Sequence, residues 1–168
     1  MKPNPPIDLA LLAQGYSPGF EPWWMTADLS EPIPSANHLV RPATESDIQR
    51  LRQSDVPYVI EEQIDTIRTL TTDPAGSQAM WLVALEDDEP VGHALVNLMD
   101  DHAGLFNVGV SGHHRHRGVG SSLTYAAMQA ARDRGARTMN LNSTPAGKRL
   151  YDRTGFTQFG TGQTWLRS

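Results

Sequence analysis

The 168-residue sequence predicts a mixed α+β fold of three layers, in which helices cover both faces of a central, mostly antiparallel sheet. Two observations support this prediction. Short apolar runs separated by polar turns predict strands that pair as neighbours, and strands joined by tight turns must be antiparallel. Other segments space their apolar residues as helices do, and strands joined across a helix are usually parallel. From residue 38 the predicted order is β-α-α-β-β-β-α-β-α-β-β.

Residues 1–36 predict an N-terminal arm ahead of a main domain at residues 37–168. Residues 7–13 predict one or two helical turns that end near Gly15. Residues 19–25 are apolar enough to predict a buried, extended segment that holds Trp23 and Trp24. Residues 29–36 predict a linker, because Pro32 and Pro34 disfavour both a helix and a central strand.

The elements of the main domain follow in order. Residues 38–42 predict a strand, and Thr44 or Ser46 is expected to cap the next helix, with Asp47 in its first turn. The apolar spacing in residues 58–70 predicts a second helix. Three strands then follow, at residues 80–85, 91–99 and 105–110, joined by the polar turns 86–90 and 100–104. The last elements are a helix at 118–134, a strand at 137–142, a helix at 146–154, and strands at 156–159 and 164–166.

Composition narrows the classes of function. The net charge of −5 predicts no basic face for nucleic acid. It suits a cationic amine substrate, although solubility is the favoured explanation of this charge. The chain has no cysteine, which excludes a disulfide framework, a thiolate metal site and a cysteine nucleophile. No apolar run approaches the roughly 18 residues of a membrane span, and the N-terminus lacks the apolar core of a signal peptide. We therefore expect a cytoplasmic protein without a membrane partner.

The most informative segment is the strand, basic loop and helix of residues 106–121. The N-terminus of a helix offers unpaired backbone N–H groups and the positive end of the helix dipole, both of which attract phosphate. Gly118 and Gly120 allow a ligand to approach the backbone closely, and Arg115 and Arg117 add charge-assisted hydrogen bonds. These features predict a diphosphate site. The sequence lacks the Gly-Lys-Ser/Thr of a Walker loop, and the spacing does not fit the dinucleotide fingerprint.

At this point the sequence resembles the GCN5-related N-acetyltransferase (GNAT) family, whose coenzyme A motif is Arg/Gln-x-x-Gly-x-Gly/Ala. The matching residues here run from Arg115 to Gly120. A second motif of the family, Leu-Tyr-x-x-x-Gly-Phe, is matched by residues 150–156. The resemblance covers about residues 39–166 and implies a GNAT-like acyl-coenzyme A N-acyltransferase fold. Many members have Asn and Ala where this sequence has Thr144 and Gly147.

The resemblance implies that an amine attacks the thioester of acetyl-coenzyme A directly, with Tyr151 as the general acid for the departing thiolate. On spacing alone, Tyr151 could equally be a core aromatic residue. A backbone N–H near the strand end is expected to polarise the carbonyl. The residues expected to bind the cosubstrate are Val108, Gly109, Val110, Arg115, His116, Arg117, Gly118, Val119, Gly120, Ser121, Asn142 and Thr144.

The general base is left open. Its candidates are Glu61, Glu62, Asp100, Asp101 and His102, although charged residues in such positions are usually solvated, and a chain of waters is the alternative. Three histidines of the basic loop, at positions 113, 114 and 116, suggest a metal site. We favour the phosphate loop and expect no metal, because histidines of one short loop do not easily converge on one ion.

The N-terminal arm contains a second internal pattern. Residues 8–16 resemble residues 148–156, since each segment is a short helix, a Gly-aromatic pair and then a strand ending in tryptophan. Leu11 stands at the place of Tyr151. One hypothesis is that residues 7–29 are the vestige of a preceding acetyltransferase-like half, docked through Trp23 and Trp24 on the main sheet or on a partner subunit. The alternative is an unrelated arm with the same order of elements.

Three functions are compatible with the phosphate loop. The first is an acetyltransferase that uses acetyl-coenzyme A as cosubstrate and a small-molecule or protein amine as acceptor. The second is a non-catalytic acyl-coenzyme A-binding module that regulates a partner. The third is a nucleotide-binding domain, which the missing Walker lysine disfavours. The aromatic residues near the N-terminus also suggest a homodimer.

Overall fold

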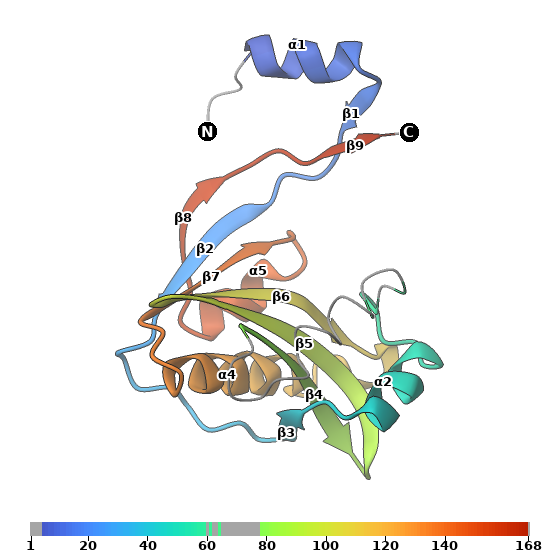
Figure 1. Cartoon of the computed structure of the whole chain (residues 1–168), viewed down its shortest axis with the longest axis vertical. Coiled ribbons are helices and arrows are strands. Elements are labelled where there is room, and N and C mark those ends of the chain that lie inside the picture. The colour runs from blue at the N-terminus through green and yellow to red at the C-terminus, as the bar shows by residue number, and fades with distance from the viewer. Residues whose placement is uncertain (1–4, 60, 62–63, 65–77, 168) are drawn as a thin grey trace. The chain divides into compact units, whose positions relative to one another are not determined.

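The computed structural model describes residues 5–59, 61, 64 and 78–167, which fall into two compact units. The arm unit comprises Met1–Thr26 and Leu141–Ser168, and the core unit comprises Ala27–Asn140. The chain crosses between them within two strands, β2 (Trp23–Asp28) and β7 (Thr138–Ser143). Figure 1 shows the elements of both units.

The core unit is built on a sheet with the strand order β3-β4-β5-β6-β7. Its members are β3 (Leu39–Pro42), β4 (Ala79–Glu86), β5 (Glu89–Met99), β6 (His102–Val110) and the first half of β7. The first three pairings are antiparallel, and β6 pairs with β7 in parallel through the three pairs from His102↔Thr138 to Gly104↔Asn140. The predicted sheet, mixed and mostly antiparallel, is confirmed.

Two tight turns fix the order of the central strands. Asp87 and Asp88 join β4 to β5 with φ angles of 50° and 63°. Two consecutive left-handed residues match the twist of a hairpin, and aspartate tolerates this conformation better than most residues. Asp100, with a φ of 54°, begins the next turn. Strand β6 begins at His102 rather than at the predicted Leu105, because the turn uses fewer residues than the polar run suggested.

Helices cover both faces of this sheet (Figure 1). Side chains alternate along a strand, so odd and even residues of β4 face opposite sides. Ile48 and Leu51 of α2 (Glu45–Arg52) pack in one apolar cluster with Trp81, Val83 and Leu85. On the other face, α4 (Val119–Arg132) contacts β4, β5 and β6, and Leu123 is completely buried. Each fully buried aliphatic side chain of this kind contributes about 1.5–3 kcal/mol.

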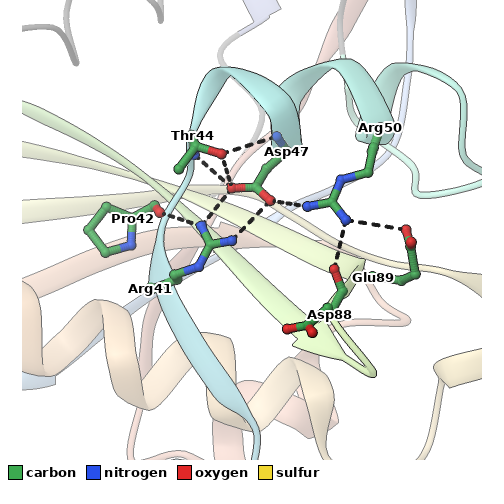
Figure 2. A network of polar contacts seen from close by, with 7 residues as sticks. All are labelled: Arg41, Pro42, Thr44, Asp47, Arg50, Asp88 and Glu89. Atoms are coloured by element: carbon green, nitrogen blue, oxygen red, sulfur yellow. Dashed lines mark hydrogen bonds and ion pairs between the residues drawn. The ribbon is translucent and has the colours of Figure 1, made fainter.

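A buried carboxylate joins α2 to β3 and to the hairpin turn (Figure 2). The Asp47 side chain is fully buried and accepts hydrogen bonds from Arg41 at 2.6 Å, from Arg50 at 2.7 Å and from Thr44 at 2.6 Å. The same Thr44 caps the helix in a capping box. Arg50 also donates to the carbonyl of Asp88 at 2.7 Å. Burial alone would raise the pKa of Asp47, but the hydrogen bonds from Arg41 and Thr44 outweigh it and hold this pKa well below its usual range.

The arm unit brings the two ends of the chain together. It contains α1 (Pro5–Ala13), β1 (Tyr16–Pro18), α5 (Lys148–Arg153), β8 (Thr157–Thr161) and β9 (Trp165–Arg167). Strand β1 pairs with β9 and β2 pairs with β8, both antiparallel. The predicted boundary between residues 36 and 37 stays a prediction, and the compact units follow other limits.

One expectation from the sequence is corrected by the structure, and another concerns residues that the structure does not describe. Residues 19–25 are extended in part. Pro22 and Met25 are buried, as expected, but Phe20 is 46% exposed and Trp24 is 43% exposed, so the expected burial holds for only part of this segment. The helix predicted at 58–70 falls largely outside the described residues. Among the helices of the described part of the chain, none has the length and apolar character needed to cross a membrane.

We predict that Asp47→Asn lowers the free energy of unfolding by about 3 kcal/mol at neutral pH, because it leaves two arginines without their buried partner. Because the folded-state pKa is lowered from 3.8, the contribution of Asp47 is complete above about pH 4 and is lost as the pH falls. Urea unfolding of the variant and the wild type at several pH values measures both effects.

The matched control is Asp152→Asn, which removes an exposed ion pair between Lys148 and Asp152. Exposed pairs of this kind contribute about 0.5 kcal/mol or less. Equal losses in the two variants, or a difference that does not shrink in acid, would contradict the role assigned to Asp47.

Candidate functional site

Strand β6 changes direction at a β-bulge. In the register, His93 of β5 pairs with Gly109 and Leu95 pairs with Phe106, so two residues of β6, Asn107 and Val108, lie opposite a single residue of β5. Asn107 has a φ of 51°, as the first residue of a bulge can. The parallel ladder with β7 ends at Gly104. The part of β6 from Leu105 to Val110 therefore pairs with β5 on one edge and lies beyond the ladder on the other.

A buried histidine supports the strand at this bulge. His93 is 2% exposed, and both of its ring nitrogens are engaged. Trp81 Nε1 donates to Nδ1 at 3.1 Å, and Nε2 donates to the carbonyl oxygen of Pro57 at 2.9 Å. Burial lowers the pKa of His93, although the hydrogen bond to Pro57 opposes it, so the ring is neutral with its proton on Nε2.

Gly109 lies where no other residue fits. A Cβ atom built on it would lie 2.2 Å from the Pro57 carbonyl oxygen and 3.1 Å from the His93 ring. The first of these atoms belongs to the backbone and cannot move aside. The absence of a side chain therefore allows residue 57 and strand β6 to approach each other at the bulge.

The segment after β6 is anchored at its start. Ser111 N donates to the carbonyl of Val91 at 2.9 Å, and Gly112 N donates to Asp55 Oδ2 at 2.9 Å. The hydrogen bond from the Ser111 side chain, with that from the Gly112 amide, lowers the pKa of Asp55. These contacts hold residues 111–112. Of the basic residues that follow, His114 is half-buried and the others are exposed.

The basic loop combines exposed guanidinium groups with one carboxylate. Arg115 Nε donates to the Val110 carbonyl at 3.2 Å, which holds its guanidinium beside the end of β6. Glu86 lies 3.7 Å from Arg117 and 3.3 Å from His114 in ion-pair geometry. His113 and His116 are exposed. Within the described residues no cluster of three His, Asp, Glu or Cys side chains could hold a metal ion.

Helix α4 starts at a left-handed glycine. Gly118 has a φ of +91°, a conformation that glycine adopts at little cost, and Ser122 N donates to its carbonyl at 2.9 Å. By helix geometry the N–H groups of Val119, Gly120 and Ser121 have no partner within the helix. These amides, the helix dipole and the guanidinium groups of the preceding loop fit a diphosphate, because all of them favour negative charge.

The remaining predicted residues, Tyr151, Asn142 and Thr144, lie in the arm unit. Tyr151 lies on α5, and its ring packs edge-on against Phe156 with 5.7 Å between the centroids. Thr144 Oγ1 accepts a hydrogen bond from the Gly147 amide at 3.2 Å. A Cβ on Gly147 would lie 3.2 Å from the Tyr151 ring. Asn142 is exposed near the end of β7.

These contacts give the two departures from the family motif a local reason. A threonine at position 144 stabilises the turn into α5, and a glycine at position 147 leaves room for the aromatic ring. A methyl group at 3.2 Å is tighter than ordinary van der Waals contact, so an alanine there would press on Tyr151.

Most candidates for the general base already have a partner. Glu61 pairs with Arg52 at the surface. Asp101 lies 3.3 Å from His102, whose Nδ1 lies 2.6 Å from Thr138 Oγ1. Asp100 forms the turn before β6, and Glu62 lies outside the described residues.

Sequence reasoning missed three residues that support the loop: His93, Asp55 and Glu86. His93 had a signal, since it stands within an apolar run that predicts a buried strand, where an imidazole needs two partners. Asp55 and Glu86 had no signal in the sequence. Asp55 contacts Gly112, which is 57 positions away in the chain, and Glu86 contacts His114 and Arg117. Contacts between residues this far apart depend on the fold.

Comparisons with known proteins agree with this geometry. The model of the Acetyltransferase (GNAT) family matches residues 41–156, well over half of the chain. A search of curated proteins found no match.

Solved structures share the fold at low identity. A GCN5-related N-acetyltransferase from Kribbella flavida aligns with a TM-score of 0.69 and 19% identity, covering 96% of this chain and 63% of its own. One from Sphaerobacter thermophilus aligns with a TM-score of 0.69 and 22% identity, covering 96% and 56%. The glucosamine-6-phosphate N-acetyltransferase from Arabidopsis thaliana aligns at 0.57 and 16%, covering 74% and 94%. The chain therefore spans less than two thirds of the length of the first and second of these structures.

We predict that Gly109→Ala lowers the free energy of unfolding by about 2–3 kcal/mol, since the new methyl group meets the backbone at residue 57. Gly104→Ala, on the same strand, is the control. Its methyl group would meet only the exposed ring of Phe106, which can rotate away. Chemical denaturation measures the free energy of unfolding of both variants. Equal losses would contradict the close contact assigned to Gly109 and the Pro57 carbonyl.

Proposed function

Because the chain belongs to the acetyltransferase (GNAT) family, we propose that it transfers the acetyl group of acetyl-coenzyme A to a primary amine. The observation that carries the proposal is the continuous path from the bulge of β6 through the basic loop to the left-handed start of α4. In this proposal the amides that open α4, with Arg115 and Arg117, bind the diphosphate of the cosubstrate.

The edge of β6 suits the pantetheine arm. Residues Val108 to Val110 lie beyond the ladder with β7, and an extended ligand with amide groups can hydrogen-bond to such an edge as an added strand does. Gly109 keeps the supporting layer close behind this edge. A backbone N–H here could polarise the thioester carbonyl, a contribution that electrostatic preorganisation makes large.

The proposed reaction is a direct transfer. The amine nitrogen forms a bond to the thioester carbon, the carbon–sulfur bond breaks, and the departing thiolate takes a proton from the Tyr151 hydroxyl. The proton lost by the amine passes to water or to a base. Holding the two reactants together supplies up to roughly 7–11 kcal/mol in ideal cases, so no covalent enzyme intermediate is required. The acceptor is a small-molecule or protein amine, and the net charge of −5 suits a cation.

We predict that Arg115→Ala and Arg117→Ala each weaken the binding of coenzyme A by about 10-fold, the loss expected for one charge-assisted contact to phosphate. Isothermal titration measures the dissociation constants. Arg134→Ala, just beyond the other end of α4, removes the same charge and serves as the control. Unchanged binding in both loop variants, or an equal loss in the control, would exclude the diphosphate site.

We predict that Tyr151→Phe lowers kcat by about 100-fold or more and leaves the dissociation constant of acetyl-coenzyme A within about 3-fold, because the variant keeps the ring and loses the acidic proton. A thiol-release assay over a panel of amines measures turnover. Tyr16→Phe makes the same chemical change elsewhere in the arm unit and is expected to keep full activity.

The same assay separates the alternative function. Binding of acetyl-coenzyme A without turnover of any amine would support a regulatory acyl-coenzyme A-binding module in place of an enzyme. Turnover that Tyr151→Phe leaves unchanged would keep the enzyme and remove the role of this tyrosine.

A further inference from the structure

A histidine from outside the basic loop lies beside the first turn of α4. Ser122 belongs to this turn and is 1% exposed. Its hydroxyl oxygen lies 3.2 Å from Nδ1 of His38, the residue before β3. A Cβ atom built on Gly118 would lie 3.7 Å from Cε1 of the same ring. The imidazole of His38 therefore lies along the side of α4 that positions 118 and 122, four residues apart, have in common.

The hydrogen bonds of Ser122 fix the tautomer of this imidazole. The backbone amides of Asn37 and His38 both donate to the Ser122 hydroxyl oxygen, at 3.1 and 3.2 Å. A hydroxyl group has two acceptor lone pairs and one proton to donate. Because the two amides occupy both lone pairs, Ser122 is left to donate its proton to Nδ1 of His38. An imidazole that accepts at Nδ1 has its own proton on Nε2.

The Nε2 atom of His38 therefore has a proton to donate. It points away from Ser122, because the two nitrogens of an imidazole ring point in nearly opposite directions. It is also bonded to Cε1, the ring atom that lies beside Gly118. No residue in the described part of the chain accepts a hydrogen bond from it. A donor is thus held next to the start of α4, and the other nitrogen of the same ring anchors it to the helix.

The groups around the start of α4 are also donors. The amides of residues 119–121 have no partner within the helix. Gly118 is exposed, and so are Arg115 and Arg117 in the loop that precedes it. Several donors that lack acceptors and lie near the positive end of a helix are complementary to a phosphate group. The Nε2–H group of His38 adds one more donor, from a different segment of the chain.

We propose that His38 is a further residue of the cosubstrate site, and that its Nε2–H group donates a hydrogen bond to the diphosphate of coenzyme A. This proposal rests on the function proposed above, in which the amides of α4 and two arginines bind the same diphosphate. His38 precedes residues 41–156, which the family model matches, so the family motif does not include it. Ser122 acts through His38 and is a positioning residue.

Two substitutions separate the contact with phosphate from the contact with Ser122. The amide nitrogen of glutamine can take the place of Nε2, so His38→Gln keeps the donor. Asparagine is shorter and reaches only to the place of Nδ1, so His38→Asn keeps a partner for Ser122 and loses the donor. We expect His38→Asn to weaken coenzyme A binding about 10-fold, the loss of one hydrogen bond to a charged group, and His38→Gln to stay within about 3-fold of the wild type.

Isothermal titration measures these dissociation constants, and urea unfolding checks that both variants are folded. Dephospho-coenzyme A, which lacks the 3′-phosphate, identifies the phosphate group concerned. The loss in His38→Asn is expected to be the same with this ligand, because it retains the diphosphate.

Nitrogen-15 NMR of the histidine-labelled protein gives a second readout, which a merely structural role would not change. We expect Nε2 of His38 to carry the proton before any ligand is added. The signals of Nε2 and its proton are expected to shift when coenzyme A is added. The spectrum of His38→Gln assigns these signals, because they are absent from it.

Four results would overturn the proposal: a proton on Nδ1, equal affinities of the two variants, a loss in His38→Gln that His38→Asn does not show, or a loss that disappears with dephospho-coenzyme A. If coenzyme A does not bind to the wild type, the proposed function fails as well. If Arg115→Ala weakens the binding and His38→Asn does not, only the role of His38 is removed. The two failures are therefore distinguished by the same titrations.

Discussion

The close approach of strand β6 to the carbonyl of Pro57 is the constraint on which the candidate site depends. It requires a glycine at position 109 and an imidazole at position 93 that donates its Nε2 proton to the Pro57 oxygen. Nδ1 of the same ring accepts from Trp81, so the ring is neutral and its tautomer is fixed. His93 and the backbone of residue 57 therefore lie directly behind the bulge. They hold the edge of β6 that β7 leaves unpaired, from Leu105 to Val110, in place before any ligand binds. This preorganisation lowers the entropic cost of binding.

The elements that the sequence predicts best are those whose signals are local. The apolar runs of β4 and β5, the two-aspartate turn between them and the glycine-bounded helix α4 each follow from residues within one segment. The left-handed Gly118 is of the same kind, because the glycine stands directly between a basic loop and a helix. Local chemistry thus predicted the loop that the family match also contains.

Features that depend on distant residues were not predictable in this way. The bulge at Asn107 becomes visible only when β5 and β6 are paired, because one strand then has a residue more than the other. Asp47 was expected as a helix-cap residue, yet its buried carboxylate also binds Arg41 and Arg50, which the first turn of a helix does not require. The exposure of Trp24 likewise depends on what covers a strand pair, and hydrophobicity does not report this.

The residues assigned to the cosubstrate are distributed over both units of the chain. The groups proposed to hold the diphosphate belong to the core unit, whereas Asn142, Thr144 and the proposed acid Tyr151 belong to the arm unit. Within the arm unit, Thr144 accepts a hydrogen bond from the Gly147 amide, and Gly147 leaves room for the Tyr151 ring. The turn before α5 therefore positions the proposed acid and also contains a residue expected to contact the cosubstrate, so the division into units does not separate binding from chemistry.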